Sequence, residues 1–174
     1  MFRLLVCVII YSEWRFFRSE NRIETDNLTT HTGEVWQRDG RMLMMRKLFH
    51  DDEKAVEYQA DDFRALNQNP SWQRQALLID AITLSQLKEV GARWENGKPL
   101  RFCRGDVDGG QLEVVWRVEI NLPQSIVRTH GKSVELTQLQ TVTALASALW
   151  KHSGGDYDVI DYADLGDHEH DHSF

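Results

Sequence analysis

The sequence has little cysteine and no long apolar run. Its 174 residues include only Cys7 and Cys103, too few for the disulfide framework of a small secreted domain. The longest apolar stretch, residues 4–10, is far shorter than the roughly 20 residues of a membrane-spanning helix. No small-residue cleavage site follows it, so it predicts a buried β-strand better than a secretory signal. We therefore expect a cytoplasmic protein without a membrane segment. Residues 1–33 could also form a poorly ordered extension.

Positive charge is outnumbered by negative charge and is missing from the C-terminus. The formal net charge is −7, and residues 153–174 carry seven Asp and Glu without any Lys or Arg. Duplex DNA binding needs a clustered basic face, which the nearly neutral remainder of the chain does not provide. The charge distribution argues against duplex DNA as a ligand and favours a protein partner with a basic surface.

Hydrophobic periodicity and turn residues predict an α+β fold. Residues 112–122 alternate apolar and polar side chains, as in a half-buried antiparallel strand. Turn signals predict three β-hairpins: 34–38 with 41–45 around Asp39-Gly40, 100–104 with 112–122, and 125–129 with 133–136. Helices are expected at 52–67, 71–90 (ended by Gly91 and Asn96-Gly97) and 138–152, and a loop at 18–33. Residues 83–86 resemble a capping box, so the second helix could break there, and residues 76–82 could instead form a strand.

The predicted architecture is an antiparallel sheet of β-hairpins packed by two or three helices, with an acidic C-terminal tail. A single domain is expected over residues 1–155 and an acidic, His-rich tail over 156–174. Trp116 and Leu149 are expected to be buried where strand 112–122 meets helix 138–152. Within the tail, Val159-Ile160 is expected to form a short edge strand.

The tail also holds a candidate metal site. Its imidazoles alternate with carboxylates, and both groups ligate zinc or nickel. In an extended chain His168, His170 and His172 share one face, flanked by Asp167 and Asp171. Because a structural site normally draws its ligands from a rigid frame, a solvated tail with adventitious affinity is the favoured interpretation. No resident cofactor is expected.

Acids and apolar groups alternate in the tail, a pattern typical of segments that dock into basic grooves with apolar floors. The candidate partner-binding residues are Asp164, Leu165, Asp167, Glu169 and Phe174. The last few residues resemble the acidic, phenylalanine-ended tips of single-stranded DNA-binding proteins, although the proline of those tips is missing. We carry over no function from so short a likeness.

The sequence contains no catalytic signature. Cys103 and His130, with Asp106 or Asp108 to orient the imidazole, form a candidate nucleophile–base pair, but a structural thiol is the favoured interpretation. The sequence therefore predicts a non-enzymatic interaction protein: an adaptor, inhibitor or assembly factor. The alternatives are a metal-binding protein that uses the tail cluster and a single-stranded nucleic-acid binder with an acidic gating tail. Self-association also remains open.

Overall fold

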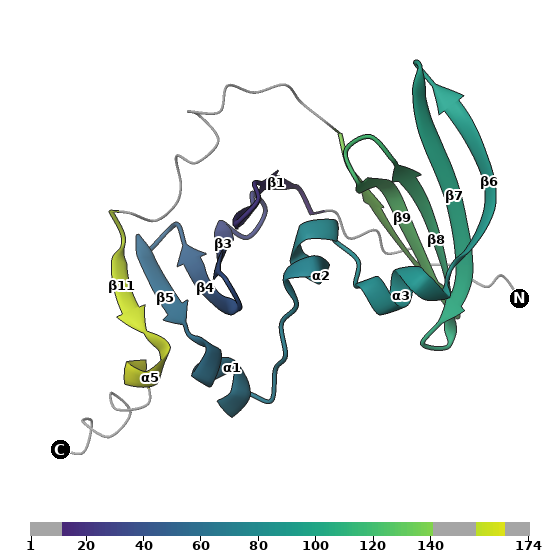
Figure 1. Cartoon of the computed structure of the whole chain (residues 1–174). Helices are drawn as coiled ribbons and strands as arrows, with labels where there is room; N and C mark the ends of the chain where they lie inside the picture. The colour runs from purple at the N-terminus through teal and green to yellow at the C-terminus, as the bar shows by residue number, and fades with distance from the viewer. Residues whose placement is uncertain (1–11, 141–155, 166–174) are drawn as a thin grey trace, which may run out of the picture. The chain divides into compact units, whose positions relative to one another are not determined.

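The computed structural model describes residues 12–140 and 156–165, which form two compact units (Figure 1). Unit 1 contains the chain up to residue 68 together with the C-terminal stretch, and unit 2 begins at residue 69. Each unit is built on one β-sheet, of six strands in unit 1 and five in unit 2. The predicted α+β fold, a sheet packed by two or three helices, is therefore wrong. Strands dominate, and the described residues contain only four short helices.

Sheet 1 is an antiparallel meander with one parallel strand added at its edge. Its strands are β1 (Trp14–Arg18), β2 (Arg22–Asn27), β3 (Thr32–Asp39), β4 (Met42–Phe49), β5 (Lys54–Tyr58) and β11 (Asp158–Asp161). β11 pairs in parallel with β5, which confirms the edge strand predicted at Val159-Ile160. The short helices α1 (Ala60–Ala65) and α5 (Tyr162–Leu165) follow β5 and β11.

Two segments of unit 1 differ from the sequence prediction. The polar stretch 18–33, predicted as a loop, contains β2, whose Ile23 is buried and pairs with Trp36. The predicted helix 52–67 is β5 followed by α1. Acidic residues 51–53 looked like a helix start, but they lie in the β4–β5 hairpin loop, where Glu53 has a φ of 52°. Polar residues suit a loop as well as a first helical turn, so composition alone could not separate the two.

The β3–β4 hairpin is confirmed and is longer than predicted. Asp39 pairs with Met42, so its loop is Gly40-Arg41 rather than Asp39-Gly40. Gly40 has a φ of 58°, as the first central residue of a type II′ turn requires.

Sheet 2 is a five-stranded antiparallel meander. Its strands are β6 (Lys88–Glu95), β7 (Lys98–Val107), β8 (Gly110–Arg117), β9 (Leu122–His130) and β10 (Ser133–Gln138). The predicted hairpins β7–β8 and β9–β10 are confirmed. The predicted helix 71–90 is instead α2 (Trp72–Leu77), α3 (Ala81–Gln86) and the start of β6. Asn96-Gly97, predicted to end that helix, is the β6–β7 turn, and both residues have positive φ.

The predicted strand 112–122 is also shorter than expected. It ends at Arg117, and residues 118–121 form a turn before β9 begins at Leu122. Trp116 is buried as predicted, at 7% exposure, in a core with Ile79 from the α2–α3 connection. Leu149 and nearly all of the predicted helix 138–152 lie outside the described residues, as does the predicted strand at 4–10. β10 ends at Gln138. No described helix is long and apolar enough to cross a membrane.

Candidate functional site

Three polar side chains meet where β11 joins sheet 1. The Tyr157 hydroxyl lies 2.8 Å from Nδ1 of His50, and Oδ1 of Asp26 lies 3.1 Å from Nε2 of the same ring. The side chains of His50 and Asp26 are only 18% and 15% exposed. A hydroxyl, an imidazole and a carboxylate in this order resemble the relay that activates nucleophiles in many enzymes, although the contact between His50 and Asp26 lacks hydrogen-bond geometry. The chemistry open to these three side chains therefore depends on whether the Tyr157 phenol is protonated.

The surroundings of Tyr157 fix the protonation state of its phenol. Burial raises the pKa of Tyr157, and the nearby charges of Glu53 and Asp26 raise that pKa further. The phenol therefore stays protonated at neutral pH, and its hydroxyl shares a 2.8 Å hydrogen bond with Nδ1 of His50. The Tyr157–His50 contact anchors the start of the C-terminal stretch to sheet 1.

Two further contacts hold the same C-terminal stretch. The Asp158 N–H donates to the Glu53 carbonyl at 2.9 Å, and the Tyr162 ring stacks on Tyr58 with centroids 4.7 Å apart. No local sequence pattern could have predicted these contacts, because Tyr157 and His50 are 107 residues apart in the chain.

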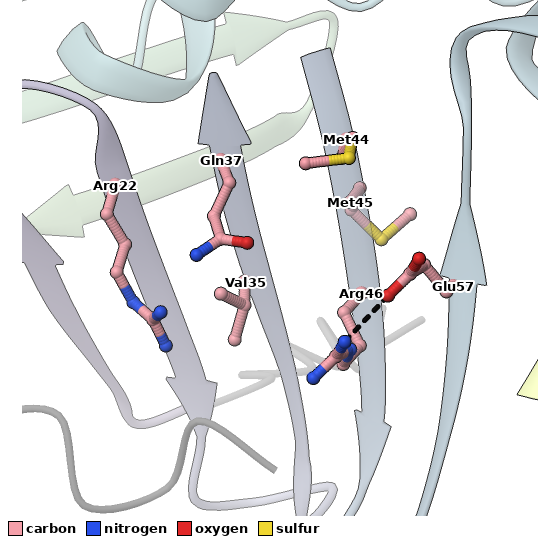
Figure 2. Close-up of a pocket in the computed structure, with 7 residues that line it drawn as sticks. All are labelled: Arg22, Val35, Gln37, Met44, Met45, Arg46 and Glu57. Carbon is pink, nitrogen blue, oxygen red and sulfur yellow. Dashed lines mark hydrogen bonds and ion pairs between the residues drawn. The ribbon is translucent and has the colours of Figure 1, made fainter. Parts of the chain in front are cut away.

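A small pocket opens on the face of sheet 1 that carries Val35 (Figure 2). Its volume is about 110 Å³, well below that of a typical small-molecule site. Nη2 of Arg46 donates to Glu57 at 2.6 Å, and Nε of Arg22 donates to Glu24 at 2.8 Å. Because a carboxylate pairs each guanidinium, the pocket offers little net charge to a ligand. Within 12–140 and 156–165, no group of three or more His, Cys, Asp or Glu side chains could hold a metal ion.

The predicted tail residues fall mainly outside the described chain. Those at 166–174 are the candidate metal ligands and part of the partner-binding set, namely Asp167, His168, Glu169, His170, Asp171, His172 and Phe174. Asp164 and Leu165 lie in α5, and both are exposed. The metal and partner roles of the tail therefore remain predictions.

The structure separates the candidate nucleophile–base pair. Cys103 on β7 pairs with Val114 on β8, and Val114 pairs with Ile126 on β9. His130 lies four residues beyond Ile126 along β9. Four strand residues span about 13 Å, too far for a hydrogen bond. Burial also raises the pKa of Cys103, which packs against the core of unit 2. This thiol is structural.

Acidic side chains from two distant segments gather at the β11 edge of unit 1. The parallel pairing brings loop residues 51–53 beside residues 156–158. Asp156, Asp158, Asp161 and Asp164 are exposed along the C-terminal stretch, and no Lys or Arg occurs between residues 156 and 165. The sequence shows the acids of each segment, whereas their meeting depends on the fold.

Large apolar side chains are exposed mainly in unit 2, on both edge strands of its sheet. Trp94 on β6 is 74% exposed, and Val134 and Leu136 on β10 are 67% and 56% exposed. Trp94 pairs with Pro99 of β7, one position from the hairpin turn. The sequence does not reveal these surfaces, because Trp94 follows a predicted helix and the edge position of the predicted strand with Val134 and Leu136 depends on the fold.

Comparisons with known proteins add little about function. No family model and no curated protein matches the chain. A solved structure described as "Structure of PNGF-II in P21 space group" is similar to 86% of this chain, with 14% sequence identity and a TM-score of 0.42. The chain spans only 28% of that protein. A likeness this weak carries no argument about fold or activity.

Proposed function

We propose that the chain is a non-enzymatic interaction protein that binds a partner protein through edge strand β6, with Trp94 as the anchor. The exposure of Trp94 carries this proposal. Isolated exposed apolar residues are common on protein surfaces, but a tryptophan with about three quarters of its surface in water is unusual. Tryptophan is also the residue type most enriched among side chains that dominate binding energy at protein interfaces.

The hairpin that carries Trp94 has a well-defined turn and a side-chain contact across its two strands. Asn96-Gly97 makes a two-residue turn with φ values of 51° and 74°, the geometry of a type I′ hairpin. On the strand before it, the Arg93 guanidinium lies 5.2 Å from the centroid of the Phe102 ring. A preorganised surface lowers the conformational entropy lost on binding.

The acids of unit 1 support a partner with a basic surface. Opposite charge accelerates association and makes the association rate sensitive to salt. We also propose that the protein is cytoplasmic and that it acts as an adaptor, an inhibitor or an assembly factor. Metal binding, one alternative, gains no observation from residues 12–140 and 156–165. The exposed Trp94 ring is also the kind of side chain on which single-stranded nucleic acid stacks, so single-strand binding is the second candidate function.

Trp94→Ala tests the proposal in a capture experiment with full-length protein and lysate of the native source. We expect the wild-type protein to retain a specific partner. We expect Trp94→Ala to retain at least tenfold less of that partner. Ile82→Ala is the matched control, since Ile82 is 73% exposed in the same unit but lies in α3. Both variants should keep the circular dichroism spectrum of the wild type. Equal retention by Trp94→Ala and Ile82→Ala would contradict the assignment of β6 as the binding surface.

A further inference from the structure

The two edges of sheet 2 differ in their protection against strand pairing. The β6 register shifts between Glu89 and Gly91, which leaves Val90 as a bulge, and the strand carries four charged residues. Bulges and charges are the features that natural sheets use to block edge-to-edge association. β10 has neither a register shift nor a proline, and Glu135 is its only charged residue.

The backbone groups on the open side of β10 can be assigned from its register. Ser133 closes a two-residue loop with His130, so Ser133, Glu135 and Thr137 direct their backbone groups toward β9. The Leu139 N–H, which donates to the Gln124 carbonyl at 2.9 Å, continues this alternation. Val134, Leu136 and Gln138 therefore direct their N–H and C=O groups away from the sheet.

The side chains on this edge are apolar as well. Val134 and Leu136 share one face of the sheet, where Leu136 pairs with Val127 of β9. No strand of the described residues pairs with this side of β10. An edge with outward backbone groups and apolar side chains is a template for another strand.

We infer that β10 pairs antiparallel with β10 of a second copy of this chain, about a two-fold axis through Leu136. In this register Leu136 faces Leu136, Val134 faces Gln138 and Glu135 faces Thr137. All three outward residues then form ladder bonds, about six in total. The same apolar face continues across both copies.

The other symmetric registers are less favourable. An axis through Glu135 would place two carboxylates directly opposite each other, which destabilises a strand pair. It would also leave Gln138 unpaired, giving about four ladder bonds. An axis through Thr137 would pair only residues 136–138 of each β10. Glu135 thus selects the register centred on Leu136. This pairing uses neither β6 nor Trp94, so it is independent of the proposed partner site.

Analytical ultracentrifugation of the full chain between about 1 and 100 μM tests the pairing. We expect a reversible dimer, and we expect Leu136→Lys to raise its dissociation constant at least tenfold, because two ammonium groups would face each other at the axis. Val118→Lys is the matched control, since Val118 is an exposed apolar residue in the β8–β9 turn. A wild-type monomer at all concentrations, or equal effects of the two lysines, would overturn the inference.

Cysteine crosslinking tests the register. Under mild oxidation Leu136→Cys should form a disulfide-linked dimer several-fold faster than Glu135→Cys, with the unmodified chain as the background for Cys7 and Cys103. Equal or faster crosslinking of Glu135→Cys would overturn the Leu136-centred pairing. Capture of a different protein by β10, with the chain itself monomeric, would overturn self-pairing and leave the Trp94 proposal untouched.

Discussion

Asp80 shows how one side chain sets the start of an element. Its Oδ1 accepts the Thr83 backbone N–H at 2.8 Å, and its Oδ2 accepts the Thr83 hydroxyl at 2.6 Å. These bonds cap α3, whose Leu84 packs against the core of unit 2. Because they favour the ionised carboxylate, they lower the pKa of Asp80.

Replacing this cap should destabilise the protein at neutral pH. Asp80→Ala is expected to lower the free energy of unfolding by about 1 kcal/mol. Ser71→Ala is the control, because Ser71 occupies the N-cap of α2 without a side-chain capping bond. Urea denaturation at pH 7 measures both changes.

The pH dependence of the Asp80 effect has a defined sign. The carboxyl has a lower pKa in the folded state, so its contribution is present above the unfolded-state pKa, near 4, and is lost as the pH falls through the folded-state pKa. The stability gap between wild type and Asp80→Ala should therefore narrow in acid. A gap of constant size from pH 7 to pH 3 would contradict the capping role.

At the scale of elements, three of the hairpins were predictable and the helices were not. The turns at Gly40 and Gly131 and at Asp108-Gly109 depend on local residues that accept positive φ, so the sequence indicates where those strands reverse. The apolar residues in 52–67 and 71–90 recur at roughly helical intervals, but these segments consist of short helices and strands that follow one another along the chain. The Tyr157–His50 contact and the exposed edge strands depend on pairing between distant segments. No window of sequence contains that information.

The packing of α3 on β7 depends on a glycine. A Cβ at Gly105 would lie 3.0 Å from Cδ2 of Leu87 and 3.2 Å from the Gln86 carbonyl oxygen. Gly105→Ala should therefore push the end of α3 away and lower the free energy of unfolding by about 1–3 kcal/mol. Gly91→Ala is the control, because a Cβ there meets nothing within 4 Å. Equal thermal midpoints for the two variants would show that this close approach does not matter.

At the scale of the whole molecule, the acidic C-terminus divides into a docked part and a tail. Residues 156–165 complete sheet 1, next to Ala55 and Val56, which are buried. A test of the tail must therefore remove residues 166–174 and leave the docked part in place.

Two truncations should separate these roles. A chain ending at residue 165 should keep the wild-type thermal midpoint, because the deleted stretch is mainly polar and acidic. A chain ending at residue 155 loses β11 and α5, which uncovers the β5 edge, and its midpoint should fall by several degrees. Differential scanning calorimetry measures both midpoints. A large loss of stability in the longer truncation would show that residues 166–174 pack against the body.

The parallel pairing of β11 with β5 also has a consequence for biosynthesis. About 100 residues separate the two strands, and all of unit 2 is translated between them. At roughly 5–20 residues per second, the β5 edge waits about 5–20 s on the ribosome for its neighbour. During that interval the nascent chain presents an unfilled strand position beside Ala55 and Val56, so newly made molecules should depend on chaperones more than a chain whose sheet closes in sequence order.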